Sequence, residues 1–122
     1  MVKIMFEQHL AYLKSISLFL FLLHSFCIRA ETQVFQLVLE NHVFTPAELT
    51  IPANEKVKIV IKNKDDTAEE FDSFDLNRER VIFAKRDATI FVGPLATGQY
   101  EFFGEYHPNS ARGVVIVKDN NQ

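Results

Sequence analysis

Short segments in which apolar and polar residues alternate recur beyond the first thirty residues, and they restrict the fold more than any other feature. In residues 33–40, Phe35, Leu37 and Leu39 share one face of a strand, and residues 57–63 repeat the pattern. Turn residues separate such segments about every ten positions, as is typical of β-sandwiches. No later stretch has the period of an amphipathic helix. The pattern predicts an all-β sandwich of seven or eight strands.

The N-terminal segment has the organisation of a secretory signal peptide. Lys3 and Lys14 lie in a basic leader, an apolar run follows, and Ala30 is the small residue before the predicted cleavage point. A membrane-spanning helix needs about 20 apolar residues, so this run is short for a permanent anchor. We therefore expect a cleavable signal over residues 1–30, export to the periplasm, and one folded domain over residues 31–122.

The chain has a single cysteine, Cys27, and it lies inside the predicted leader. Residues 31–122 therefore form no disulfide and offer a metal no thiolate. They contain 10 Lys and Arg residues against 15 Asp and Glu residues, a net charge of −5. That balance disfavours nucleic acid and anionic membrane surfaces as partners, but it is compatible with cations.

The side chains of the predicted domain that could bind a metal ion or take part in a reaction are carboxylates and two histidines. Residues 64–75 hold six Asp and Glu residues among twelve positions, a composition typical of a solvated loop. The aromatic strand predicted over residues 98–106 includes Glu105 near its end. His107 follows it in a loop closed by proline and glycine, and His42 lies in a predicted turn. Imidazole with carboxylates suits iron, Cu(II), manganese or zinc better than Cu(I).

Several of these motifs resemble the cupredoxin family. The resemblance covers residues 31–122 and rests on Phe44-x-Pro46, residues 49–52 and 57–63, Gly98-x-Tyr100-x-Phe102, His107-Pro108 and Gly113. Residues 69–79 and 103–108 are similar, more narrowly, to small periplasmic cupredoxins related to the cupredoxin domains of bacterial high-affinity iron-uptake systems. The resemblance implies a Greek-key β-sandwich and a role in periplasmic iron or copper handling. It also implies a membrane iron permease or a periplasmic metal-binding protein as partner.

The positions that hold copper in this family carry different residues here. The family pattern is Tyr-x-Phe-x-Cys-x-x-His-Pro-x-Met, and only His107 of its three ligands is retained. Gly104 takes the cysteine position and Ser110 the methionine position. The pair Glu69 and Glu70 stands where the family places its first histidine. A blue-copper site needs a thiolate ligand, so we expect no blue-copper centre.

A metal site of carboxylates and imidazole is the prediction that remains, with copper or iron as the metal. We predict as its ligands Glu70, Asp72, Glu105 and His107. Glu69 and His42 are weaker candidates. Strand alternation places Glu69 on the face opposite Glu70, and the sequence leaves open which of these faces is inside.

Catalysis is not expected from this sequence. The chain has no Gly-x-Ser-x-Gly elbow, no His-Glu-x-x-His motif and no glycine-rich phosphate loop. The alternative to metal binding is a metal-free interaction module, in which the same end of the sandwich contacts a partner protein.

Overall fold

The computed structural model describes residues 2–22 and 30–120. Helix α1 spans Val2–Leu22, and among the described residues no helix combines the length and apolar character needed to cross a membrane. Contacts divide the chain into two units, Met1–Glu31 and Thr32–Gln122. The signal peptide stays a prediction, and the single cysteine, Cys27, lies outside the described residues.

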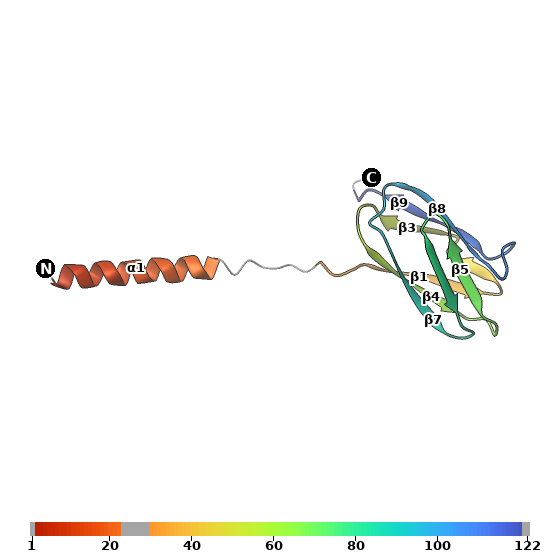
Figure 1. The fold of residues 1–122 in the computed structure, drawn as a ribbon, viewed down its shortest axis with the longest axis horizontal. Coiled ribbons are helices and arrows are strands. Elements are labelled where there is room, and N and C mark those ends of the chain that lie inside the picture. Colours follow the sequence, from red (N-terminus) through yellow and green to blue (C-terminus); the bar gives the residue numbers. More distant parts are fainter. Residues whose placement is uncertain (1, 23–29, 121–122) are drawn as a thin grey trace. The chain divides into compact units, whose positions relative to one another are not determined.

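The second unit consists of two β-sheets that face each other (Figure 1). The four-stranded sheet has the order β2-β1-β4-β7, with β1 (Val34–Glu40), β2 (Val43–Thr45), β4 (Val57–Asn63) and β7 (Asp87–Val92). The five-stranded sheet has the order β3-β9-β8-β5-β6, with β3 (Glu48–Pro52), β5 (Glu69–Ser73), β6 (Arg78–Ile82), β8 (Gly98–Gly104) and β9 (Arg112–Lys118). Pairing is antiparallel except between β1 and β4 and between β3 and β9. The predicted all-β sandwich is confirmed.

The core lies between the sheets because alternate residues of each strand point inward. In β1, Leu37 and Leu39 are fully buried, as their alternation predicted. Phe44, Phe71 and Phe102 are also buried and pack on one another, with ring centroids between 5.1 and 6.1 Å apart. Aromatic rings in edge-to-face and offset arrangements of this kind stabilise a core beyond their buried area.

The described residues form nine strands, where alternation predicted seven or eight. The three-residue β2 was not predicted, and β5 lies inside the acidic run whose composition is typical of a solvated loop. β5 departs from that composition, because Phe71 is fully buried there and Asp72 is 8% exposed. β6 and β8 pair with β5 on its two sides. Such long-range pairing overrides local composition.

The segments that carry the candidate ligands lie at the same end of the sandwich. β1 and β4 run parallel, so the β1–β2 turn and the loop after β4 lie at the same end. β5 begins there, and β8, the middle strand of its sheet, ends there, since Phe71 pairs with Gly104. The fold therefore brings three segments that are distant in sequence to one place.

Asn63, the last residue of β4, shapes the loop that leads into β5. It is buried, and its Nδ2 donates to the carbonyl oxygens of Thr67 at 2.8 Å and Ile82 at 3.1 Å. Its Oδ1 accepts the N–H of Asp65 at 2.9 Å. These bonds fix the course of the loop and so determine where Asp65 and the first residue of β5 lie.

Candidate metal site

His42 is presented by the two-residue turn between β1 and β2. Asn41 and His42 have φ angles of 53° and 59°, both left-handed, as the turn of a tight type I′ hairpin requires. Asp65 supports this turn, because its Oδ1 accepts the N–H of Asn41 at 2.6 Å and its Oδ2 accepts the N–H of His42 at 2.9 Å. The same Oδ2 lies 3.4 Å from Nδ1 of His42. Asp65 thus holds both the backbone and the ring of His42.

The pKa of the Asp65 carboxyl is lowered in the folded protein. Burial raises this pKa, but hydrogen bonds from the backbone of His42 and Asn41, with the charges of His42 and Lys85, outweigh burial. A carboxyl whose pKa is depressed by folding stabilises the fold above its unfolded pKa, which is about 3.9. That stabilisation is lost as the pH falls through the folded pKa.

We expect the substitution Asp65→Asn to lower the free energy of unfolding by about 1–2 kcal/mol at pH 7, because a charged acceptor of two N–H groups is lost. The difference from the wild type should shrink as the pH falls below about 4. Urea denaturation at pH 7, 4 and 3 measures this difference. Asp66→Asn is the matched control, because the Asp66 side chain is 92% exposed and its ion pair with Lys85 contributes little. A difference that persists unchanged at pH 3 would contradict the assignment.

Glu69 places a carboxylate inside the sandwich. It is the first residue of β5, lies on the same face as Phe71, and is 1% exposed. Its Oε1 accepts the N–H of Glu70 at 3.0 Å and the N–H of Tyr106 at 2.8 Å. Its Oε2 lies 2.7 Å from Nδ1 of His107. A buried carboxylate is tolerated when its oxygens have partners of this kind.

His107 lies in a tight loop between β8 and β9. Its N–H donates to the carbonyl of Gly104 at 3.2 Å, and its own carbonyl accepts the N–H groups of Ser110 at 3.2 Å and Ala111 at 2.9 Å. Its ring stacks on that of His42, with centroids 3.6 Å apart and planes inclined by 14°. The side chains of His42 and His107 are 38% and 35% exposed, so solvent reaches both imidazoles.

His42, Glu69 and His107 together form a possible metal site, and they are the one such group of three or more found among the described residues. One potential ligand atom from each lies within 4.8 Å of the others. Nδ1 of His107 and Oε2 of Glu69 are 2.7 Å apart, which is a hydrogen-bond distance, so a metal bound to both atoms would have to replace the proton between them.

The stacking of the two imidazoles determines which movement is needed before one metal ion can bind both His42 and His107. A metal binds an imidazole in the plane of the ring, about 2 Å from the nitrogen. Two nearly parallel planes with centroids 3.6 Å apart do not meet within that distance. One ring therefore has to rotate before both histidines bind the same ion. Rotation of His42 breaks the weaker contact, since its Nδ1 is 3.4 Å from Asp65 whereas His107 is 2.7 Å from Glu69.

The predicted ligands Glu70, Asp72 and Glu105 are not part of this group of three residues. Glu70 and Asp72 alternate with Glu69 along β5 and belong to its other face. Glu105 is exposed just after β8, where its N–H donates to the carbonyl of Glu70 at 2.8 Å. Of the four predicted ligands, only His107 belongs to the group. Metal binding by the other three stays a prediction.

Glu70 contacts the aromatic residue that precedes His107. Burial raises the pKa of the Tyr106 phenol, as do the charge of Glu70 and the hydrogen bond that its carboxylate accepts from the phenol. The charges of Glu69 and Glu105 act in the same direction. Tyr106 therefore stays protonated and donates to Glu70, on the side of β5 away from Glu69.

The sequence indicates that the side chain of Glu69 points inward, although a charged residue is usually exposed. Phe71 is apolar, and a strand that buries Phe71 must also direct Glu69 inward, because residues two apart share a face. His42 had a weaker signal, namely the dipeptide Asn41-His42 between two alternating segments, which indicates a tight turn. Only the packed structure shows that this turn reaches the ring of His107.

Comparisons with known proteins agree with this architecture. The profile of the cupredoxin-like domain matches residues 13–117. The chain belongs to the cupredoxin-like domain family. The uncharacterized protein RP394 of Rickettsia prowazekii (strain Madrid E) is 38% identical over 84 residues, which make up 69% of this chain and 67% of that protein.

Solved cupredoxin structures share the fold of this cupredoxin-like protein. Auracyanin A, a "blue" copper protein from Chloroflexus aurantiacus, superposes with a TM-score of 0.62 and 14% identity, over 72% of this chain and all of that one. Amicyanin from Paracoccus versutus superposes with a TM-score of 0.55 and 21% identity, over 75% of this chain and 86% of that one. At these identities the likeness concerns the fold alone.

A blue-copper centre does not fit this cupredoxin-like site. A Cβ added at Gly104, the position of the thiolate ligand in the family pattern, would lie 2.6 Å from Cδ of Glu69 and 2.7 Å from Cβ of Ala111. The buried Glu69 therefore occupies the space that a cysteine side chain would need. Ser110, at the methionine position, is exposed. The space beside β8 can hold the carboxylate of Glu69 or a thiolate at position 104, but not both.

Proposed function

We propose that this cupredoxin-like protein binds a transition metal, copper(II) or iron, through His42, Glu69 and His107. The observation that carries the proposal is the 2.7 Å contact between Nδ1 of His107 and the buried carboxylate of Glu69, with a second imidazole stacked beside it. Carboxylate and imidazole ligands without sulfur favour Cu(II) or iron over Cu(I). Sites of nitrogen and oxygen ligands generally bind Cu(II) more tightly than Zn(II), in keeping with the Irving–Williams order.

The role that we propose is that of an exported accessory protein in periplasmic iron or copper handling, a binding protein rather than an enzyme. The leader pattern of residues 1–30 supports export. The resemblance to cupredoxins of iron-uptake systems supports transfer of metal to a membrane iron permease or to another periplasmic protein. The partial exposure of both imidazoles supports a site from which metal exchanges.

Titration of the purified protein with Cu(II), Fe(III) and Zn(II), followed by calorimetry, tests this function. We expect Cu(II) to bind more tightly than Zn(II), without the intense blue colour that a thiolate ligand produces. His107→Ala and His42→Ala should each weaken Cu(II) binding at least about tenfold. Glu105→Gln is the matched control, because Glu105 is exposed near the same loop but lies outside the group.

Two results would contradict this ligand set. Cu(II) binding that is unchanged in both histidine variants would exclude the group as the metal site. A loss of affinity in Glu105→Gln with none in His42→Ala would instead place the metal with the ligands predicted from sequence, Glu70 and Glu105.

A metal-free interaction module is the second candidate function, and one observation favours it. Both carboxylate oxygens of Glu69 already have protein partners, so this end of the sandwich is complete without an ion. Thermal unfolding separates the two functions, because a ligand that binds only the folded state raises the midpoint temperature. A midpoint that does not change with excess Cu(II), Fe(III) or Zn(II) would support the module.

A further inference from the structure

Two carboxylates face each other on the outer side of the five-stranded sheet, away from Glu69. Asp72 of β5 and Glu79 of β6 are directly opposite in the strand pairing. Like charges at such positions destabilise a sheet. Arg78 and Arg80 flank Glu79 in the chain, and strand alternation places both on the other face of β6. The Nε of Arg78 donates to the carbonyl of Phe91 at 2.7 Å and its Nη1 to that of Asn77 at 2.8 Å.

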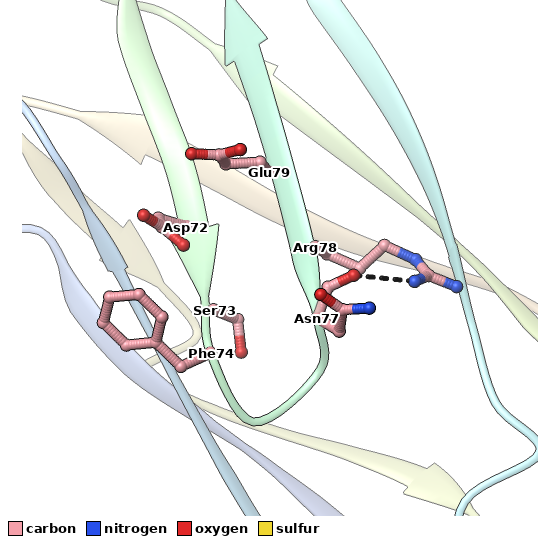
Figure 2. Close-up of a pocket in the computed structure, with 6 residues that line it drawn as sticks. All are labelled: Asp72, Ser73, Phe74, Asn77, Arg78 and Glu79. Atoms are coloured by element: carbon pink, nitrogen blue, oxygen red, sulfur yellow. Dashed lines mark hydrogen bonds between the residues drawn. The ribbon is translucent and has the colours of Figure 1, made fainter.

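The side chain of Asp72 is largely covered, and among the described residues its carboxylate has no hydrogen-bond or ion-pair partner. It is 8% exposed, and none of the hydrogen bonds among the residues lining this pocket involves its carboxylate (Figure 2). Figure 2 shows the carboxylates of Asp72 and Glu79 on the side of the β5–β6 hairpin where the ring of Phe74 lies, whereas Arg78 extends the other way. Both carboxylates line a pocket of about 310 Å³. No buried side-chain nitrogen or oxygen of the described residues lacks a hydrogen-bond partner, so the unpaired oxygens of Asp72 open onto this pocket. Two unneutralised carboxylates at one pocket attract a cation from outside.

An aromatic surface adjoins the two carboxylates. Phe74, in the turn after β5, is 81% exposed, and its ring lies 5.7 Å from that of Phe103. Phe103 is paired with Asp72 across β5 and β8. The face of an aromatic ring attracts cations, and Arg stacks on such rings more often than Lys. An exposed phenylalanine beside an unpartnered carboxylate therefore offers two interactions to the same ligand.

We propose that Asp72, Glu79 and Phe74 form a docking site for a cationic side chain, arginine foremost, on a partner protein. A planar guanidinium can form paired hydrogen bonds with carboxylates and stack on a phenylalanine, whereas an ammonium group is a point charge. The negative charge of the two carboxylates complements such a partner. A metal ion would use only the carboxylates and would gain nothing from Phe74. The site is separate from the His42 group and does not depend on metal binding there.

Nuclear magnetic resonance titration of the isotope-labelled protein tests the docking site, with N-acetyl-arginine amide as the probe. Saturable shifts are expected at the backbone amides of residues 72–79 and of Phe103. N-acetyl-lysine amide should bind several-fold more weakly. N-acetyl-citrulline amide, which has the shape of arginine without the charge, should not bind. Asp72→Asn should reduce arginine affinity at least tenfold, and Phe74→Ala several-fold.

Two further variants serve as a second test of the docking site and as its control. Glu79→Gln alters an exposed residue and tests the site without disturbing buried structure, and it should also weaken arginine binding. Glu48→Gln removes an exposed carboxylate from β3, at the other edge of the same sheet, and should change nothing. Equal binding of arginine and citrulline probes, or binding indifferent to Asp72→Asn and Glu79→Gln, would overturn the proposal. So would displacement of arginine by submillimolar Ca²⁺, which would indicate an ion site, or shifts that depend on protein concentration, which would indicate a second copy as occupant.

Discussion

Substitution of Gly104 by cysteine is expected to destabilise the protein and not to produce a blue-copper centre. The added Cβ would lie 2.6 Å from Cδ of Glu69 and 2.7 Å from Cβ of Ala111. Glu69 cannot simply move aside, because its carboxylate has three protein partners. Overpacking of a filled interior typically costs 1–3 kcal/mol, and we expect a loss of about 2–3 kcal/mol in the free energy of unfolding.

Urea denaturation of Gly104→Cys and Gly104→Ala measures this cost. The alanine variant should show most of the loss in the free energy of unfolding, because the clash arises at Cβ. Ser110→Cys is the control for the thiol itself, since Ser110 is exposed in the adjoining loop and should tolerate the change. In a Glu69→Ala background the cost of Gly104→Cys should fall by at least about 0.5 kcal/mol. Wild-type stability, or a blue colour on adding Cu(II), would show that Glu69 does not occupy this space.

Removal of the Glu69 carboxylate is expected to be the second large effect. Glu69→Ala leaves the N–H groups of Glu70 and Tyr106 without their acceptor and the ring of His107 without its partner. Buried donors that lose a partner cost about 1–3 kcal/mol each, although water can enter beside the partly exposed His107. We expect the free energy of unfolding to fall by about 2–4 kcal/mol. Glu69→Gln keeps one acceptor oxygen and should cost about half as much.

Amide hydrogen exchange distinguishes a local from a general effect of these variants. The amides of Glu70 and Tyr106 donate to Glu69 and should lose protection in Glu69→Ala more than the amides of the core strands. Glu101→Gln, at an exposed position of β8, is the matched control and should leave both amides protected. Unchanged stability in Glu69→Ala, or unchanged exchange at both amides, would contradict the role assigned to this carboxylate.

Most of the sheet could be predicted because its strands show the two-residue period that burial of one face requires. β1 and β4 bury the residues that their alternation indicated. β3 is an edge strand, which agrees with the prolines at positions 46 and 52, because proline cannot donate a hydrogen bond inside a sheet. β5 could not be predicted in the same way. Its charges are typical of a loop, and only pairing with β6 and β8 makes it a strand.

The candidate site was predictable in its location and only partly in its residues. His107, at the end of the aromatic strand β8, was identified from local pattern alone. The choice between Glu69 and Glu70 depends on which face of β5 is inside, and the burial of Phe71 decides it. The stacking of His42 on His107 joins residues from opposite sheets, so no local pattern reports it.

The sequence by itself determined the all-β class, the absence of a thiolate from residues 31–122, and therefore the exclusion of a blue-copper centre. These properties follow from residue type and from the short period of strands, both of which are local. The tertiary structure alone decided that the carboxylate of Glu69 fills the space beside Gly104 and that His42 completes the group. It also decided that Asp72 lies opposite Glu79 and has no hydrogen-bond or ion-pair partner among the described residues. The physical reason is that burial and charge pairing depend on which strands become neighbours, and residues far apart in the chain determine that.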